Sequence, residues 1–288
     1  DATASLGETW LGTTDKPLLF VLIVGETARA ANFSLDHYAR NTNPNLASKD
    51  IIYYSEVTAC GTSTAVSLPC MFSDDDRAHF SRKAAAQKEN LLDLIAQVGL
   101  DVSWFDNNSG CKGVCVRTPQ LKLEYDSETC NSEHCFDLAM LQALAAPADT
   151  NQFIVMHQQG SHGPYYSQQV PDDLALFVPT CETSQLQDCS REEIVNAYDN
   201  TILYTDLFIA QTIERLEQLS DKYTTAVIYI SDHGESLGEK GIYLHAAPYF
   251  MAPKEQLEVP MLTWLSEDFS QRFGIDKGCL KRAAGVPI

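Results

Sequence analysis

The sequence has 288 residues, of which 44% are apolar and 20% charged, a composition typical of a globular protein with a full hydrophobic core. Acidic side chains outnumber basic ones by 39 to 20, and the net charge of −19 argues against nucleic-acid binding, which needs rows of cations to neutralise phosphates. No stretch approaches the roughly 20 apolar residues that a membrane helix needs. Residues 1–15 lack the features of a signal peptide, and we interpret residues 1–16 as a linker.

Eight of the nine cysteines form four pairs that are close in sequence: Cys60 with Cys70, Cys111 with Cys115, Cys130 with Cys135, and Cys181 with Cys189. The two Cys-x2-Cys repeats of a zinc ribbon are absent. We therefore predict local disulfides, paired by proximity, that pin loops in an oxidising compartment. Cys279 is left over.

The first predicted strand covers residues 18–24, an apolar run suited to a parallel strand that is buried on both faces. Glu26 follows its end directly. A carboxylate in this place is a candidate ligand or catalytic group. The alternative is a first-turn glutamate that interacts favourably with a helix dipole.

A second strand, over residues 51–57, leads into a small-residue turn, and we predict a helix that starts near Thr64. A hydroxyl at a helix N-terminus faces N–H groups that favour an anion. Plain N-capping also selects serine and threonine, and for this stretch alone it is the favoured explanation. Four hydroxyls remain as alternatives for a chemical role: Thr62, Ser63, Thr64 and Ser67.

The middle of the chain alternates again between helix and strand. The expected elements are a charged loop over 74–87, helices over 89–98 and 135–146, and strands over 102–105 and 152–156. Asn108, Ser109 and Lys112 follow the third strand and could orient a substrate, although this is also ordinary turn chemistry.

His162 follows the fourth strand beside a glycine and a proline and is a ligand candidate. His157 is closer to the strand, and we interpret it as structural. Residues 165–188 form a long loop, which suits either a substrate-facing flap or a plain packed loop.

The longest predicted helix covers residues 191–219. We interpret Asp199 and Asp206 on it as solvated or capping groups rather than ligands. Strands follow over residues 225–230 and 260–265, and the tail from residue 266 onward is polar with little pattern.

Asp232 and His233 follow the fifth strand, and His245 lies twelve residues beyond His233. Gly234 is expected to let the backbone turn sharply so that the two side chains converge. Aspartate oxygens and histidine nitrogens are ordinary zinc ligands. The alternative is an Asp–His hydrogen bond within a turn.

Strands that alternate with helices predict an α/β fold, a three-layer sandwich with a mostly parallel central sheet and helices on both faces. The candidate groups then all follow the carboxyl ends of strands and can meet at one edge of the sheet. Oxygen and nitrogen ligands favour zinc, with manganese left open. The chemistry that this set supports is displacement at phosphorus or sulfur, in which a metal acidifies a hydroxyl and offsets the developing charge.

Four motifs occur in order within residues 17–265: Gly25-Glu-Thr-Ala-Arg29, Cys60-Gly-Thr-Ser-Thr-Ala65, His162-Gly-Pro164, and Ser231-Asp-His-Gly-Glu-Ser-Leu-Gly-Glu239 with His245. With these motifs the chain resembles the lipid A phosphoethanolamine transferases. That family includes the mobile colistin-resistance enzymes and belongs to the alkaline-phosphatase/sulfatase superfamily, whose fold is therefore expected here.

The resemblance also implies roles for individual residues. Thr64 matches the nucleophile that becomes a phosphoethanolamine-threonine intermediate. The residues that match a tightly bound zinc site are Glu26, Thr64, Asp232 and His233. Those that match a second zinc or phosphoryl site are His162 and His245. Those that match positions suggested to hold the phosphoethanolamine head group are Thr62, Asn108, Ser109 and Lys112.

The family implies a two-step reaction in which phosphatidylethanolamine gives its head group to Thr64 and a lipid A phosphate then takes it, which confers polymyxin resistance. It also implies an N-terminal transmembrane domain outside this sequence. Residues 1–288 are then a single monomeric catalytic domain at the periplasmic face of the bacterial inner membrane. The family usually adds a helix after the last strand, so the C-terminal end is a candidate truncation.

Three alternatives stand beside this one. A metal-dependent phosphatase or sulfatase differs only in letting water resolve the intermediate, although the Cys60 stretch lacks the Cys-x-Pro-x-Arg-like context of a sulfatase. A phosphoethanolamine transferase could act on another glycan. A disulfide-stapled binding domain would hold a structural zinc, but such sites usually have four protein ligands and no reactive hydroxyl.

Overall fold

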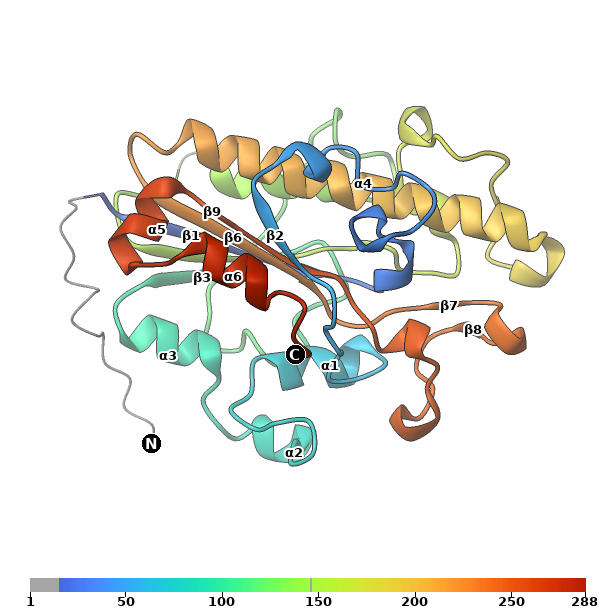
Figure 1. Ribbon diagram of the computed structural model, residues 1–288, viewed down its shortest axis with the longest axis horizontal. Helices are drawn as coiled ribbons and strands as arrows, with labels where there is room; N and C mark the ends of the chain where they lie inside the picture. Colours follow the sequence, from blue (N-terminus) through green and yellow to red (C-terminus); the bar gives the residue numbers. More distant parts are fainter. Residues whose placement is uncertain (1–15, 146) are drawn as a thin grey trace.

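The structure, a computed structural model, describes residues 16–145 and 147–288, so most of the predicted linker lies outside the described residues. In this part of the chain seven strands form one sheet in the order β2-β9-β6-β1-β5-β3-β4, and β7 and β8 form a separate small sheet (Figure 1). The strands are β1 Leu18–Gly25, β2 Ile51–Tyr54, β3 Asp101–Asp106, β4 Gln120–Leu121, β5 Gln152–His157, β6 Thr224–Ser231, β7 Ser236–Leu237, β8 Tyr243–Leu244 and β9 Met261–Leu265.

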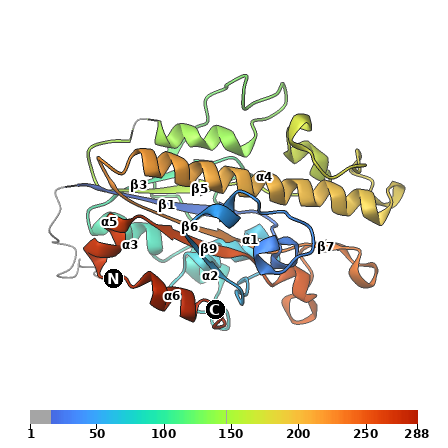
Figure 2. The same ribbon diagram turned by 45° about the horizontal axis from the view of Figure 1, so that its top comes forward.

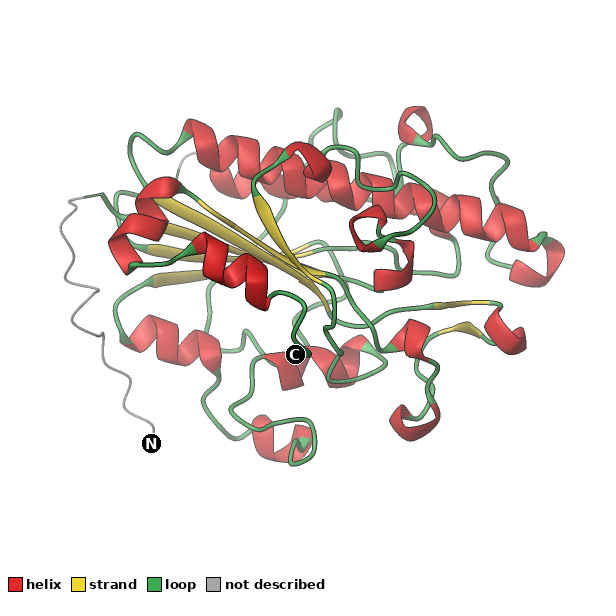
Figure 3. Ribbon diagram, in the orientation of Figure 1, coloured by secondary structure: helices red, strands yellow, loops and turns green. Residues whose placement is uncertain are grey.

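Helices and short 3-10 turns connect these strands (Figure 3). The α-helices are α1 Thr64–Met71, α2 Arg82–Ala85, α3 Leu91–Gln97, α4 Arg191–Gln218, α5 Glu267–Phe273 and α6 Lys277–Ala283. The 3-10 helices are η2 Ala30–Asn32, η3 Ser34–Asp36, η4 Leu46–Ser48, η5 Asp137–Leu144, η6 Tyr166–Gln169, η7 Asp172–Leu174, η8 Leu186–Asp188, η9 Glu239–Gly241, η10 Tyr249–Met251 and η11 Lys254–Gln256.

The centre of the main sheet is parallel. β1 pairs in parallel with β5 and β6, and β3 pairs in parallel with β4 and β5. β9 runs antiparallel to both β6 and β2. β1 is buried along most of its length, as its continuous apolar sequence requires.

Two helical layers cover the sheet, with α4 on one side and α3, α5 and α6 on the other (Figure 1; Figure 2). On the α4 side, Ile202, Phe208 and Ile213 are buried in one cluster with Val21 of β1. On the other side the second cluster combines strand residues with three helical side chains: Leu68 of α1, Leu92 of α3 and Phe269 of α5. The predicted three-layer α/β fold with a mostly parallel sheet is confirmed.

None of the helices in the described residues combines the length and the apolar character needed to cross a membrane. The predicted helix over residues 135–146 differs from the structure. Residues 137–144 adopt the tighter 3-10 pitch instead, and Ala146 lies outside the described residues.

The tail from residue 266, predicted to have little pattern, instead forms α5 and α6. Ser266 Oγ accepts a hydrogen bond from the N–H of Phe269 at 3.2 Å, and Gly274 ends α5 with a φ of +62°. Asp276 Oδ1 accepts from the N–H of Cys279 at 3.1 Å and so caps α6. Each of these helices has seven residues, too few to show a clear periodic stripe of apolar side chains. The capping residues are therefore the sequence feature that indicates both helices.

Asp199 and Asp206 were predicted to be solvated or capping groups. Solvation is wrong, because both are fully buried, whereas capping is confirmed for Asp206. Asp206 accepts hydrogen bonds from the N–H of Asn45 at 2.9 Å and of Leu46 at 3.0 Å, and so caps η4, a distant part of the chain. Asp199 forms an ion pair with Arg40 at 2.9 Å. The segment after β1 folds over α4, which the helix's own sequence pattern does not reveal.

We expect Asp206→Ala to leave two backbone N–H groups without acceptors beneath this segment. Because an unsatisfied buried donor costs about 1–3 kcal/mol, the free energy of unfolding should fall by about 2–4 kcal/mol. Guanidinium unfolding followed by tryptophan fluorescence measures it. The matched control is Asp221→Ala, an exposed aspartate after the same helix, which should change stability by less than about 0.5 kcal/mol. Equal stability of the two variants would contradict the capping role.

Candidate active site

The carboxyl ends of β1 and β6 bring two acidic side chains together. Gly25 and Ser231 are partners at the last position of the parallel pairing, so Glu26 and Asp232 leave the sheet side by side. The N–H of Asp232 donates to the carbonyl of Gly25 at 3.0 Å. Glu26, Asp232 and the adjacent His233 are all fully buried. The register of the sheet therefore fixes this cluster.

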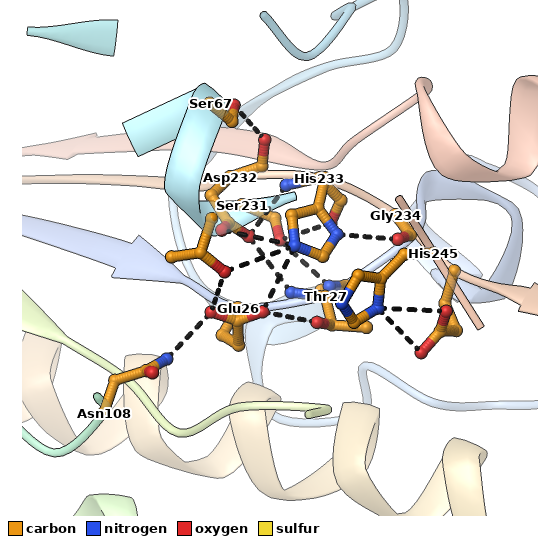
Figure 4. A network of polar contacts seen from close by, with 12 residues as sticks. Glu26, Thr27, Ser67, Asn108, Ser231, Asp232, His233, Gly234 and His245 are labelled. Atoms are coloured by element: carbon orange, nitrogen blue, oxygen red, sulfur yellow. Dashed lines mark hydrogen bonds and ion pairs between the residues drawn. The ribbon is translucent and has the colours of Figure 1, made fainter. Parts of the chain in front are cut away.

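Thr64 joins the cluster from the first position of α1 (Figure 4 shows the surrounding network). Its Oγ1 donates to Glu26 Oε2 at 3.0 Å and lies 3.4 Å from His233 Nε2. His233 Nε2 is in turn 3.3 Å from Glu26 Oε1 and 3.5 Å from Asp232 Oδ2. The hydroxyl of Thr64 thus faces two ionisable side chains.

The other candidate hydroxyls of this stretch point elsewhere. Thr62 Oγ1 donates to the carbonyl of Ala247 at 2.7 Å, and Ser67 Oγ donates to the backbone carbonyl of Asp232. No side-chain hydrogen bond of Ser63 is found within the described residues, although Ser63 occupies the N-cap position of α1. The geometry therefore separates Thr64 from hydroxyls that the residue pattern alone left equivalent.

The charges of the cluster change the pKa of each member. Burial raises the pKa of Asp232, and the neighbouring Glu26 raises it further, to about 6. Burial also opposes ionisation of Glu26, but the hydrogen bond and charge of His233 outweigh it and hold that pKa below its ordinary value. For His233, burial favours the neutral ring, yet Asp232 and Glu26 raise its pKa to about 10. Two carboxylates at this depth require a positive charge beside them.

The side chains of the cluster fit a metal ion. Asp232 Oδ2 is buried and has no hydrogen-bond partner among the described residues. His233 Nδ1 lies 2.9 Å from the carbonyl of Gly234, so we assign it the donor proton, which leaves Nε2 to face the carboxylates. Ligand atoms of Glu26, Asp232 and His233 all lie within 4.8 Å of one another. Two carboxylate oxygens, one imidazole nitrogen and an adjacent hydroxyl suit zinc.

Thr27 is held in a strained conformation beside the cluster, a feature that the sequence pattern did not single out. Its φ of +59° is rare for a β-branched residue. Its N–H donates to Asp232 Oδ1 at 3.2 Å, its hydroxyl donates to Glu26 Oε1 at 2.5 Å, and its carbonyl accepts from the hydroxyl of Tyr198 at 2.7 Å. The strained residue thereby orients both carboxylates.

Gly234 serves a different purpose from the one predicted. Its φ lies outside the left-handed region, so a sharp turn is not what requires glycine. A Cβ at this position would lie 2.1 Å from the carbonyl oxygen of Glu255. The glycine therefore permits a close approach of two backbone segments, and its N–H donates to the carbonyl of Gln256 at 3.0 Å.

Two further histidines lie beside the cluster. The ring centroid of His245 is 4.4 Å from that of His233 and 6.0 Å from that of His162. His245 Nδ1 lies 3.3 Å from Glu235 Oε1, and Tyr166 donates to Glu235 Oε2 at 3.0 Å. Glu235 is fully buried, and its carboxylate contacts the ring of His245. The sequence feature that could have indicated this contact is the place of Glu235 in the motif, directly after Gly234.

Of the residues predicted to hold the head group, only some lie close to the cluster. Asn108 Nδ2 donates to Glu26 Oε2 at 2.8 Å, so this side chain reaches the cluster (Figure 4). Lys112 Nζ donates to Ser109 Oγ at 2.6 Å, and this pair is exposed beside Asn108. Thr62 instead anchors the chain next to His245, because its carbonyl accepts from the N–H of Ala246 at 2.7 Å.

The predicted local disulfides are confirmed: Cys60–Cys70, Cys111–Cys115, Cys130–Cys135 and Cys181–Cys189. Two of them pin segments next to the cluster, since Cys60 precedes the turn to Thr64 and Cys111 adjoins Lys112. Cys279 is a free, exposed thiol.

The chain is similar to known proteins over most of its length. The sulfatase family model matches residues 19–283. Phosphoethanolamine transferase EptA of Salmonella typhimurium is 46% identical over 94% of this chain and 51% of its own length. Phosphatidylethanolamine transferase Mcr-1 of Escherichia coli is 44% identical over 86% of this chain and 48% of its own length. The chain thus spans about half the length of these curated relatives.

The chain covers a larger share of one solved structure than of these relatives. The soluble domain of lipooligosaccharide phosphoethanolamine transferase A from Neisseria meningitidis superposes with a TM-score of 0.90 at 43% identity, covering 95% of this chain and 84% of that one. The expected resemblance is therefore confirmed: the chain belongs to the sulfatase family and, within it, to the phosphoethanolamine transferases.

Proposed function

We propose that this domain transfers phosphoethanolamine from phosphatidylethanolamine to a phosphate of lipid A through a covalent intermediate on Thr64. The observation that carries this proposal is the position of the Thr64 hydroxyl. Thr64 is the first residue of α1, and its hydroxyl donates to Glu26 Oε2 and faces His233 Nε2. The relatives named above are phosphoethanolamine and phosphatidylethanolamine transferases.

Glu26, Thr64, Asp232 and His233 would hold one tightly bound zinc ion. When bound, zinc supplies Lewis acidity to the Thr64 oxygen and offsets negative charge on the phosphoryl group. This assignment is supported by Asp232 Oδ2, which accepts no hydrogen bond from the described residues, and by His233 Nε2, which faces the two carboxylates. A second zinc, or the phosphoryl group itself, would be bound by His162 and His245, with Glu235 fixing the ring of His245.

In the first half-reaction Thr64 Oγ1 attacks the phosphorus of phosphatidylethanolamine. The bond from phosphorus to the glycerol oxygen breaks, and diacylglycerol leaves with the proton that Thr64 gave up. Glu26 Oε2 accepts the hydrogen bond of that hydroxyl and so orients its lone pairs. The N-terminus of α1 directs its partial positive charge at the transferred group. Thr62, Asn108, Ser109 and Lys112 would hold the head group.

In the second half-reaction an oxygen of a lipid A phosphate attacks the same phosphorus, and Thr64 Oγ1 leaves and regains a proton. Burial of the cluster limits access by water, which favours transfer over hydrolysis. The added amine lowers the negative charge of lipid A and would confer resistance to cationic polymyxins.

We place this domain, as a single monomeric unit of residues 1–288, at the periplasmic face of the bacterial inner membrane. Four disulfides favour an oxidising compartment. The half of the relatives' length that this chain does not span would include the membrane domain through which the full-length protein reaches its lipid substrates.

The first test is the intact mass of the zinc-loaded protein after incubation with phosphatidylethanolamine in micelles. Wild type should gain one phosphoethanolamine, whereas Thr64→Ala should show no adduct and a rate at least about a thousandfold lower, because the nucleophile is lost. Ser63→Ala is the matched control and should keep the adduct.

Other outcomes of this experiment separate the alternatives. An adduct on Thr64→Ala would move the nucleophile to another hydroxyl. Release of free phosphoethanolamine by wild type without acceptor, at the rate seen with lipid A, would favour the hydrolase. If the adduct forms but the phosphoethanolamine is transferred only to a glycan other than lipid A, the proposed acceptor is wrong.

Zinc affinity should rise with pH. His233 holds a proton up to its pKa of about 10 in the metal-free cluster, and this proton must leave before Nε2 can ligate. Release of one proton predicts about a tenfold rise in affinity per pH unit around neutrality. Below about pH 6, Asp232 also binds a proton and the dependence should steepen.

Chelator-competition titrations of the apo protein across this pH range measure the slope. His79→Gln is the control, since His79 is exposed and should leave the slope unchanged. An affinity that does not vary with pH would contradict the cluster as the zinc site.

A further inference from the structure

A basic pocket lies next to the proposed active site. It has a volume of about 520 Å³ and lies between α2, the start of α3 and the segment after Lys112. Its charged lining residues are four cations and one carboxylate: Arg82, Lys83, Lys88, Lys112 and Glu89. This is an unusual concentration of positive charge in a chain with a net charge of −19.

Most of this positive charge is not neutralised. Within the described residues, neither Arg82 nor Lys83 has a carboxylate partner within ion-pair distance, and both are exposed at the pocket. Lys112 donates only to oxygens of Ser109. Lys88 is paired with Asp75 at 3.1 Å. Three cations are therefore available to an anion from outside.

The walls of the pocket are fixed by the fold. Asn90 Nδ2 donates to the carbonyl of Val114 at 2.7 Å, which ties the start of α3 to the opposite wall. The Cys111–Cys115 disulfide closes the segment that carries Lys112. The pocket is thus a structured concavity rather than a row of surface lysines.

The pocket and the Thr64 cluster share structural elements. Pro69 of α1 lines the pocket five residues after Thr64, a rise of about 7.5 Å along the helix. Lys112 follows Asn108, whose side chain touches Glu26. α2 also packs beside α1 (Figure 1). One extended ligand could therefore reach both places.

We propose that this pocket binds a second anionic group of the phosphorylated glycolipid acceptor while the phosphate to be modified lies at Thr64, an inference that rests on the proposed function. The donor does not account for Arg82 and Lys83. Phosphatidylethanolamine has one phosphate, which reacts at Thr64 with Lys112 beside its head group, and its ammonium group would be repelled by further cations. Lysine and arginine bind phosphate oxygens through charge-assisted hydrogen bonds. An acceptor with two phosphates matches two anion-binding places.

The test compares Lys83→Glu with Lys122→Glu in the zinc-loaded protein. Lys122 is exposed, is absent from the pocket and has no ion pair within the described residues, so the two variants change the net charge equally. For an acceptor disaccharide with two phosphates, Lys83→Glu should raise KM about tenfold. Its KM for the acceptor with one phosphate and the rate of adduct formation on Thr64 should match wild type. Lys83→Arg should restore the low KM.

Three results would overturn the proposal: equal KM values in the two charge-reversal variants, a KM that rises equally for both acceptors, or slower adduct formation in Lys83→Glu alone. In the last case the pocket would serve the donor. A loss of binding to phosphatidylglycerol vesicles without acceptor, with KM for soluble acceptor unchanged, would assign the cations to a membrane surface instead.

A binding measurement separates the pocket from the proposed reaction. Calorimetric titration with the deacylated glucosamine disaccharide bisphosphate should show about tenfold weaker binding to Lys83→Glu than to Lys122→Glu. If the two variants differ in this way but the wild-type protein transfers no phosphoethanolamine, the proposed function is wrong and the anion site is supported. If transfer occurs and all proteins bind this probe equally, the pocket proposal alone fails.

Discussion

Two carboxylates buried side by side are the constraint around which this protein is built. Glu26 and Asp232 are fully buried and follow directly on paired residues of β1 and β6. Such a pair is unstable unless a positive charge or several donors compensate it. The protein supplies His233, the N–H and hydroxyl of Thr27 and the amide of Asn108, yet one oxygen of Asp232 accepts no hydrogen bond within the described residues. This incomplete compensation is what a metal ion would complete.

The parallel sheet makes this arrangement possible at low conformational cost. Because β1, β5 and β6 run in the same direction, the residues that follow their carboxyl ends lie at one edge of the sheet. No long loop is needed to bring their side chains together. The strain is confined to a few positions, such as Thr27, which the hydroxyl of Tyr198 holds from α4. Leu244 and Ala246, which flank His245, also have positive φ values of 64° and 70°. The rigid layers thus support strained connections next to the cluster of Glu26, Asp232 and His233.

Sequence alone placed the parts of the site that follow strand ends, and it was weakest where burial is decided by distant segments. Glu26, Asp232 and His233 were predictable because buried strands end directly before them. The burial of Asp199 and Asp206 could not be predicted, since only the folding of the segment after β1 over α4 buries them. The choice of Thr64 among neighbouring hydroxyls came from resemblance, because spacing cannot tell which hydroxyl turns toward Glu26. The helices α5 and α6 were missed although Ser266, Gly274 and Asp276 marked their ends.

The distribution of charge links the site to its surroundings. A chain with a net charge of −19 repels anionic lipids at long range, although salt screens this beyond roughly 8–10 Å. Close to the protein the local arrangement of charges matters more, and Arg82, Lys83 and Lys112 gather positive charge at one pocket. Attraction is then limited to groups that enter the pocket. In the proposed binding mode, this acidic protein would discriminate among anions by position, because only a ligand with correctly spaced phosphates would gain from both the cations and the site at Thr64.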